Sequence, residues 1–297
     1  MLRASLLASV QQKLEQASGQ LVQLANPRPV SGGCINQSAI LETDAGASLF
    51  VKWNDKAPSN LFETESAGLE AIRSTGTLRV PRVMGHGESI DGISFLVLEA
   101  IAVTPPPPDF EQRLGRQLAE MHRFGQEGEF GFAHSNFLGR TGQPNDWNPD
   151  WVEFWKVNRL GYQFELARHN GYLDSPFCKA AERMVNRLDD LLGHENQPSL
   201  LHGDLWSGNY LADPQGNPVL IDPAVYYGDR EAEFGMTTLF GGLGRGFYQA
   251  YEEVWPLDAG SETRIEIYRL YHLLNHLNLF GVSYLAECWE IVQKYGR

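Results

Sequence analysis

Four consecutive prolines at residues 105–108 divide this 297-residue sequence into two parts of different character. A proline run has no backbone N–H donors and favours an extended conformation, so it continues neither a helix nor an inner strand. We interpret it as a spacer at a lobe boundary rather than as a surface loop within one lobe. The sequence therefore predicts an N-terminal lobe over residues 1–101 and a C-terminal lobe over residues 102–297.

The N-terminal lobe has the pattern of a small antiparallel sheet. Residues 20–53 contain three short strand-like runs with turn residues between them, which is typical of a meander. Residues 59–76 carry apolar side chains at helical spacing and predict a helix, and residues 93–101 predict a buried strand. The stretch at residues 80–89, with two glycines, is predicted to be a turn.

The C-terminal lobe is mostly helical by the same criteria. Amphipathic runs such as residues 110–124 predict several helices, which only residues 199–204 and 218–223 interrupt as strand-like pieces. The predicted fold class is therefore α+β, with a small β-rich lobe that contains one helix and a larger helical lobe.

Composition narrows the classes of function. The formal net charge of −13 at pH 7 argues against nucleic-acid binding, which needs a basic face, but leaves room for a nucleotide site. The three cysteines lie far apart and predict no disulfide framework, which suits a reducing compartment. The first residues are typical of a helix rather than a signal peptide, and no apolar run is long enough for a membrane span. We expect a cytoplasmic protein.

The stretch "HGDLWSGN", residues 202–209, gives the strongest indication of chemistry. Taken alone it is compatible with a turn, because glycine, aspartate, serine and asparagine favour turns. Its H-x-D-x-x-x-x-N spacing is also that of the catalytic loop of protein-kinase-type phosphotransferases. Asp204 would then accept the proton of the attacking hydroxyl, Asn209 would offer an amide oxygen to Mg²⁺, and His202 would hold the loop. Asp222, at the end of a predicted buried strand, is a candidate second ligand, because Mg²⁺ prefers hard oxygen ligands.

Two further features of the N-terminal lobe suit a bound nucleotide. Gly32 and Gly33 lie between two predicted strands and would let the backbone approach a phosphate, although for the glycine pair taken alone a hairpin turn is the favoured explanation. Lys52 could extend along an exposed strand face. Glu65, however, lies on the apolar face of the predicted helix, where an unpaired charge is costly. A Lys52–Glu65 pair that orients the lysine toward the phosphates of ATP accounts for both residues.

Several stretches resemble the fructosamine kinase (ketosamine-3-kinase) family, which belongs to the aminoglycoside-phosphotransferase-like branch of the protein-kinase-like fold. They are "SGGCINQSA", "FVKW" with "LFETESAGLEAI", "GRQLAEMHR", "QPNDWNPDWVEFW", "LLHGDLWSGN", "IDPAVYYGDREAE" and "LYHLLNHLNLFG". Together they cover nearly the whole chain. The tryptophan of "HGDLWSGN" is the most diagnostic residue, because it separates this family from other small-molecule kinases.

The resemblance implies a protein-kinase-like fold with a nucleotide-binding N-terminal lobe and a catalytic, acceptor-binding C-terminal lobe. It also implies an ATP- and Mg²⁺-dependent kinase that phosphorylates the sugar 3-hydroxyl of ketosamines, either fructosamine or ribulosamine adducts. The phosphorylated adduct then decomposes and frees the amine, which is a deglycation repair. The acceptor would be a small ketosamine or a glycated amine or protein.

The resemblance also implies roles for individual residues. Asp204 would be the catalytic base, Asn209 and Asp222 the metal ligands, Lys52 with Glu65 the phosphate-orienting pair, and Gly32 and Gly33 part of the nucleotide loop. Backbone groups near Glu99 and Ile101 would meet adenine, and Trp206 would lie near the sugar of the acceptor.

Three alternatives remain. One is a kinase for another hydroxylated amine, such as an aminoglycoside or choline. Another is a nucleotide-binding module without catalysis, although Lys52, Asp204, Asn209 and Asp222 are all retained. Protein kinase activity is disfavoured, because Pro223 and not phenylalanine follows Asp222 and no A-P-E sequence occurs downstream.

Aromatic residues and histidines supply candidates for acceptor binding. Trp147 is a candidate for a loop that closes on the acceptor, whereas the nearby Trp151 and Trp155 are expected in the core. His272 and His276 have the spacing of a helical zinc pair, but no third ligand at a suitable spacing is evident. A polar stripe that lines the acceptor cleft together with Asn275 is therefore favoured over zinc.

The cysteines give one regulatory hypothesis. Cys34 follows the glycine pair, and Lys52 would favour its reactive thiolate form. A disulfide at Cys34 would join two chains, so the protein would be a monomer or a redox-linked dimer; the alternative is a small residue chosen for fit. Cys178 and Cys288 are expected to pack in helices.

Overall fold

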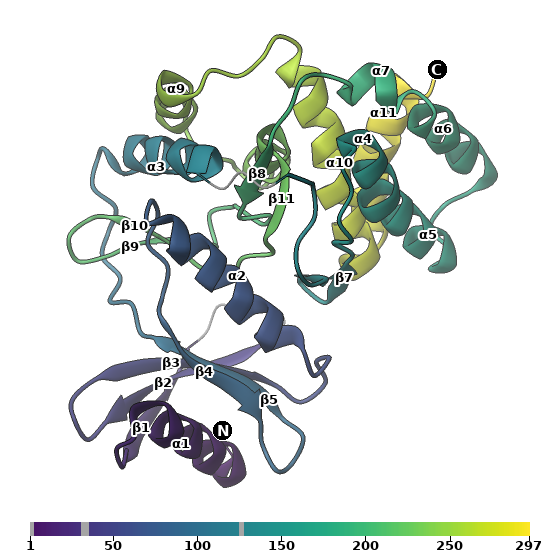
Figure 1. Ribbon diagram of the computed structural model, residues 1–297. Coiled ribbons are helices and arrows are strands. Elements are labelled where there is room, and N and C mark those ends of the chain that lie inside the picture. Colours follow the sequence, from purple (N-terminus) through teal and green to yellow (C-terminus); the bar gives the residue numbers. More distant parts are fainter. Residues whose placement is uncertain (1–2, 31–35, 125–127) are drawn as a thin grey trace. The chain divides into compact units, whose positions relative to one another are not determined.

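The computed structural model describes residues 3–30, 36–124 and 128–297 (Figure 1). Gly32, Gly33 and Cys34 therefore lie outside the described residues. The pattern of contacts divides the chain into two compact units. Unit 1 comprises Met1–Pro107 with Leu211–Asp222, and unit 2 comprises Pro108–Tyr210 with Pro223–Arg297.

Unit 1 is built on a five-stranded antiparallel sheet with the strand order β1-β2-β3-β5-β4 (Figure 1). The strands are β1 (Leu24–Pro29), β2 (Gln37–Thr43), β3 (Ser48–Asn54), β4 (Val83–Glu88) and β5 (Ser94–Glu99). The first three form the predicted meander, and β5 is the predicted buried strand, so those expectations are confirmed.

The turn predicted over residues 80–89 is wrong, because Val83–Glu88 forms β4 and pairs with β5. The register shifts between Val83 and Gly85, and Gly85 has a φ of 157°. A Cβ at Gly85 would lie 2.8 Å from Cγ of Lys13, so the glycine permits a close approach of the first helix. The turn was predicted because glycines are typical of turns, but a glycine also occurs where a strand is irregular.

Two helices accompany the sheet of unit 1. The helix predicted for the first residues is α1 (Ala4–Ser18), and its buried Leu6, Val10 and Leu14 join the apolar side chains of one sheet face. The second helix, α2 (Leu61–Thr75), confirms the helix predicted over residues 59–76 and ends at Gly76 in the left-handed conformation. Its apolar face is buried, which sets the direction of Glu65 on the same helix.

The segment Leu211–Asp222 returns to unit 1 as a hairpin, although a division after residue 101 assigns it to the C-terminal lobe. The hairpin strands are β9 (Tyr210–Ala212) and β10 (Pro218–Leu220). Thr104 donates its N–H to Ala212 O at 3.0 Å, and Leu220 donates to Arg79 O at 2.9 Å. Backbone pairing between residues far apart in sequence therefore assigns this segment to unit 1. The first junction between the units falls between Pro107 and Pro108, inside the proline run.

Unit 2 is mainly helical, as predicted. Its helices are α3 (Phe110–Phe124), α4 (Trp151–Phe154), a π-helix (Trp155–Gly161), α5 (Tyr162–His169), α6 (Ser175–Val185), α7 (Leu188–Leu192), a 3₁₀-helix (Arg230–Ala232), α8 (Glu233–Thr237), α9 (Arg245–Val254), α10 (Ser261–Phe280), a 3₁₀-helix (Val282–Tyr284) and α11 (Leu285–Tyr295). Its strands form two antiparallel pairs, β6 (Asn136–Leu138) with β7 (Thr141–Gln143) and β8 (Pro198–Leu201) with β11 (Tyr226–Asp229).

The core of unit 2 is rich in aromatic side chains around α10. Trp151 and Trp155 are buried in it, which confirms their expected role, and Trp151 donates its indole N–H to the hydroxyl of Tyr268. Cys288 is fully buried and burial raises the pKa of its thiol to about 12, while Cys178 is half-buried. Among the described residues, no helix is long and apolar enough to cross a membrane.

Candidate active site

A buried lysine in unit 1 lies between two carboxylates. Nζ of Lys52 on β3 lies 2.8 Å and 3.0 Å from the two carboxylate oxygens of Glu65 on α2, and 2.9 Å from Oδ1 of Asp222. The Lys52 and Glu65 side chains are almost fully buried, whereas the Asp222 side chain is 46% exposed. The pair suggested by the sequence is thus in contact, and Asp222 from the returning hairpin completes the cluster.

The electrostatics of this cluster keep the lysine charged. Burial disfavours the charged amine, but attraction to Asp222 and Glu65 outweighs it and raises the pKa of Lys52. Because Glu65 is buried while Asp222 is half exposed, the outer carboxylate is the one that solvent or a ligand can reach. The cluster therefore offers a fixed cation beside an accessible oxygen ligand.

The backbone at Asp222 has an uncommon conformation. Its φ of 55° falls in the left-handed region, which costs an L-residue roughly 1–2 kcal/mol and which aspartate tolerates better than most residues. Asp222 lies two residues after the end of β10, and the bend there turns its carboxylate toward Lys52. Strain of this kind is common at functional positions.

The predicted adenine contacts lie at the end of β5. Glu99 uses its N–H to bond Arg82 O and its carboxylate to bond Arg79 at 2.7 Å, so both groups serve the structure of unit 1. Ile101 follows outside the strand, and none of the described residues pairs with its N–H or C=O. Its backbone is therefore suited to a planar ligand with donors and acceptors at its edge.

In unit 2, the stretch 202–209 forms a compact loop after β8. The amide nitrogen of Asn209 donates to the carbonyl of Asp204 at 2.8 Å and to its carboxylate at 3.0 Å. Asp204 N–H is 3.3 Å from Nδ1 of the buried His202. Hydrogen bonds from the amide nitrogen thus fix the Asn209 side chain, and the amide oxygen is left to act as a ligand for a cation.

A buried carboxylate that the sequence analysis missed holds this loop. Glu233, 1% exposed at the start of α8, accepts the N–H groups of His202 at 2.6 Å and Gly203 at 3.0 Å. Burial alone would raise the pKa of Glu233, but the nearby His122 ring, whose Nε2 lies 3.5 Å away, and the hydrogen bond from the N–H of His202 keep it low. Glu233 is therefore an anionic anchor for the two residues that precede Asp204.

Gly203 is required at this point. Its φ is 80°, and a Cβ there would lie 2.1 Å from the carbonyl oxygen of Ala224. The N–H of Ala224 in turn donates to His202 O at 2.8 Å. The loop is therefore packed against the chain segment that follows Asp222, without room for a side chain.

The aromatic candidates for acceptor binding lie in different surroundings. Trp206 is partly buried, and its ring centroid is 6.5 Å from that of Phe240, which is 44% exposed. Trp147 is 43% exposed and stacks on Tyr227. Asn275 is only 2% exposed and accepts from Gln163 at 3.4 Å, so its burial does not favour direct contact with an acceptor, and its role stays a prediction.

His272 and His276 lie on α10 as the sequence predicts. The His276 ring is bonded to the chain, whereas Nδ1 of the buried His272 has no hydrogen-bond partner among the described residues. His276 Nδ1 donates to His272 O at 2.8 Å. In the described part of the chain, the one His, Cys, Asp and Glu group with atoms close enough for a metal is His194, Glu231 and Asp258, and Glu231 is already bound by Arg264 at 2.6 Å and 2.8 Å. Because His272 and Asn275 are both buried, a polar stripe that lines the acceptor cleft stays a prediction.

Burial of His272 predicts a pH dependence of stability. Burial, with the nearby His276, lowers the pKa of His272 to about 3. The unfolded imidazole, with a pKa of about 6.5, binds a proton first, so the penalty begins below pH 6.5 and grows down to pH 3. Between pH 7 and pH 5 this group should remove about 2 kcal/mol of unfolding free energy. Urea unfolding of His272→Leu at both pH values should show a smaller loss than wild type, while the exposed His169→Leu should not; equal losses would contradict the assignment.

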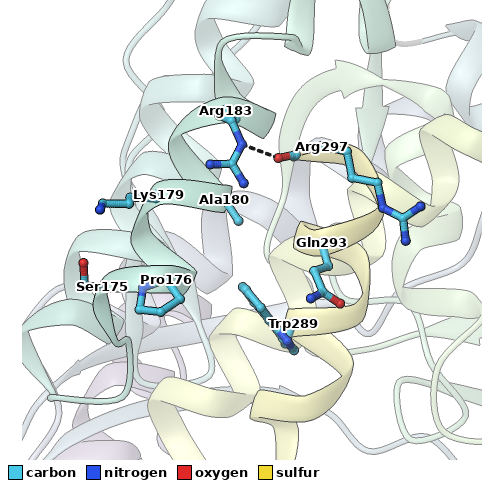
Figure 2. A pocket seen from close by; sticks show the side chains of 9 residues that line it. Ser175, Pro176, Lys179, Ala180, Arg183, Trp289, Gln293 and Arg297 are labelled. Atoms are coloured by element: carbon cyan, nitrogen blue, oxygen red, sulfur yellow. Dashed lines mark hydrogen bonds between the residues drawn. The ribbon is translucent and has the colours of Figure 1, made fainter.

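A cavity of about 520 Å³ lies between α6 and α11, away from the residues discussed so far (Figure 2). The side chains shown in Figure 2 come from Ser175, Pro176, Lys179, Ala180, Arg183, Trp289, Gln293 and Arg297. Its charged lining residues are all basic, and Arg183 donates to Gly296 O at 2.5 Å. Without a carboxylate lining residue it suits neither a magnesium site nor a general base, so size alone does not identify the reaction site.

Comparison with known proteins identifies the kind of kinase. The chain is 41% identical over 288 residues to a probable ketoamine kinase of Synechocystis sp., covering 96% of this chain and 95% of that protein. It is 44% identical over 283 residues to the chloroplastic protein-ribulosamine 3-kinase of Arabidopsis thaliana, covering 94% and 85% respectively.

Solved structures agree on the fold. A crystal structure from Haemophilus somnus that is assigned as a fructosamine-3-kinase superimposes with a TM-score of 0.87 at 28% identity, covering 96% of both chains. An aminoglycoside phosphotransferase superimposes with a TM-score of 0.64 at 16% identity, covering 96% of this chain and 98% of that chain, which confirms the protein-kinase-like fold. The family model described as fructosamine kinase matches residues 6–297, so the chain belongs to the fructosamine kinase family.

Proposed function

We propose that this protein is an ATP- and Mg²⁺-dependent kinase that phosphorylates the sugar 3-hydroxyl of ketosamines and thereby starts their removal. The single observation that supports it most is the loop in which Asn209 fixes Asp204, since a fixed carboxylate with an amide oxygen beside it serves a general base and a cation at once. Membership of the fructosamine kinase family narrows the acceptor to ketosamines.

The proposed roles follow from the chemistry of each group. Asp204 accepts the proton of the sugar hydroxyl as that oxygen attacks the γ-phosphorus and the bond from this phosphorus to the leaving ADP oxygen breaks. Lys52, oriented by Glu65, neutralises phosphate oxygens of ATP. Asp222 and Asn209 are the proposed Mg²⁺ ligands. Both fit the ion, because one is a half-exposed carboxylate and the other an amide whose nitrogen is already engaged. When bound, the ion balances the negative charge of the phosphate oxygens.

The nucleotide and acceptor contacts complete the proposal. We assign the adenine edge to backbone groups near Glu99 and Ile101, and the sugar of the acceptor to the flat face of Trp206. Gly32 and Gly33 remain the proposed phosphate loop.

We propose the cytoplasm as the location and free ketosamines or glycated proteins as acceptors. The Arabidopsis relative is named as chloroplastic, so the compartment differs among relatives. The prediction of a dimer linked through Cys34 is open to non-reducing gels and remains a hypothesis.

A parallel ATP-consumption assay tests the function. Fructosyl-lysine, ribulosyl-lysine, choline and kanamycin are compared with the same enzyme, and the two ketosamines should be turned over while the other two are not. Turnover of kanamycin or choline alone would instead favour the kinase for another hydroxylated amine. Nucleotide binding without turnover of any acceptor would favour the non-catalytic module.

Removal of the proposed metal ligands should affect nucleotide binding unequally. Asp222→Ala should weaken binding of Mg·ATP more than Asn209→Ala, because a charged oxygen contributes more to a hard cation than a neutral amide does. Titration of ATP with and without Mg²⁺ by calorimetry measures the effect of each variant. The reverse order of the two variants would overturn the assignment.

A further inference from the structure

The loop between β7 and α4, residues 144–148, is anchored by buried polar groups. Arg159, on the π-helix and fully buried, donates to Pro144 O at 2.6 Å and to Oδ1 of Asn145 at 2.7 Å. Asn145, which is 1% exposed, donates to His134 O at 3.1 Å, and Asn158 donates to Asp146 O at 3.2 Å. The guanidinium of Arg159 also lies 4.0 Å from the ring centroid of Tyr226. The buried guanidinium of Arg159 thus stabilises the conformation of this short surface loop.

At the tip of this fixed loop, two consecutive side chains face solvent. Asp146 is exposed, and no donor among the described residues bonds its carboxylate. Trp147 is 43% exposed, with one face stacked on Tyr227 at a centroid distance of 6.0 Å and an interplanar angle of 28°. A Cβ at Gly131 would lie 3.0 Å from Cα of Trp147, so a glycine beneath the loop lets it sit close. The arrangement presents an open aromatic face beside an unneutralised carboxylate.

The base of the loop and the catalytic loop share a contact point within unit 2. Gln143, immediately before the loop, donates to the carbonyl oxygen of Ala224 at 2.9 Å. The same oxygen is the one that Gly203, the residue before Asp204, approaches closely. The Asp146 carboxylate and the Trp147 indole therefore lie only a few residues after Gln143. The side chain of Gln143 contacts the same carbonyl oxygen as the loop that carries the proposed base.

We propose that Asp146 and Trp147 bind the protonated amine side of the acceptor and set the preference for ketosamines over neutral ketoses. The inference rests on the proposed function and adds two residues that recognise the amine of the acceptor. A ketosamine carries a basic nitrogen that is cationic near neutral pH, and a free or protein-bound lysine extends from it. A cation is attracted to an indole face and to a carboxylate at the same time. An uncharged sugar makes neither a cation–π interaction nor an ion pair.

The test compares the amine substrate with an isostere that carries no cationic group. Fructosyl-lysine is measured beside an analogue in which an ether oxygen replaces the linking nitrogen and the lysine α-amine is acetylated. For Asp146→Asn and Trp147→Leu, KM for the amine substrate should rise about tenfold, as expected for loss of a partly exposed cation site, while kcat stays nearly unchanged. KM for the ether should not change. Asp146→Glu, which keeps the charge, should retain most of the preference.

Asp190→Asn is the matched control, since it removes another exposed carboxylate of unit 2 and should alter neither KM. Thermal unfolding of each variant checks that the surface changes leave the fold intact. An equal change for amine and ether, or no change for either, would overturn the inference while leaving the proposed function standing. A wild type that phosphorylates neither these compounds nor ribulosyl-lysine, although it binds Mg·ATP, would overturn the proposed function and this inference with it.

Discussion

Asp204→Asn should lower kcat by roughly 10²–10⁴-fold, the usual contribution of a positioned general base. The amide has nearly the same size and still offers an oxygen to Asn209, but it no longer takes a proton from the sugar hydroxyl at neutral pH. Affinity for Mg·ATP should therefore remain close to that of wild type. Steady-state turnover of a ketosamine together with nucleotide titration separates the two effects.

The control for this prediction is Asp213→Asn, which changes a buried carboxylate of unit 1 that binds Arg79 at 2.6 Å. It should reduce stability without a comparable loss of kcat in the fraction that stays folded. If Asp204→Asn retained near-normal kcat, the base would have to be another group.

Glu233→Ala should lower kcat by about 100-fold without removing any group that reacts. The N–H groups of His202 and Gly203 would lose their shared acceptor, and displacement of a catalytic loop by about 1 Å can cost that much. The two buried donors would also be left unsatisfied, so unfolding free energy should fall by roughly 3–5 kcal/mol. Urea unfolding and kcat of the folded enzyme measure the two effects, and Glu195→Ala, an exposed change, should show neither.

Glu233 should also give a signature below pH 5. Because hydrogen bonding holds its pKa below the unfolded value, its stabilising contribution is complete above that value, about 4.3, and is lost as the pH falls toward the lower folded pKa. In Glu233→Gln, which has no charge to lose, the decline of stability in this range should be shallower. A decline as steep as that of wild type would assign the acid sensitivity to other carboxylates.

The local sequence pattern was sufficient to predict the helices and strands whose buried residues recur at a regular interval. The α2 face and β2 are of this kind, because their apolar residues fall at the buried positions of the period. The strand β4 was missed, since its Gly85 serves a close contact with Lys13, which lies far away in the sequence. The assignment of Leu211–Asp222 to unit 1 likewise depends on pairing with residues over a hundred positions earlier.

The candidate site shows the same limit. Lys52, Glu65, Asp204 and Asn209 were found because motif spacing or an unpaired charge on an apolar face marks them. Glu233 was not, although a signal existed: Asp229, Glu231 and Glu233 alternate within five residues, and all are at most 1% exposed. Buried carboxylates require partners. That rule predicts an anchoring role, but it does not say which distant N–H groups are held.

The three crossings of the chain between the units, after residues 107, 210 and 222, bear on how such a protein can change over generations. A single recombination between diverged parents within residues 108–210 would give the offspring Lys52 and Glu65 from one parent and Asp222 from the other. The lysine and the two carboxylates of one cluster would then be inherited separately. An exchange of this lobe alone needs additional breakpoints around residues 211–222, which keep the sheet and its hairpin from the same parent, so this lobe is not a freely exchangeable module.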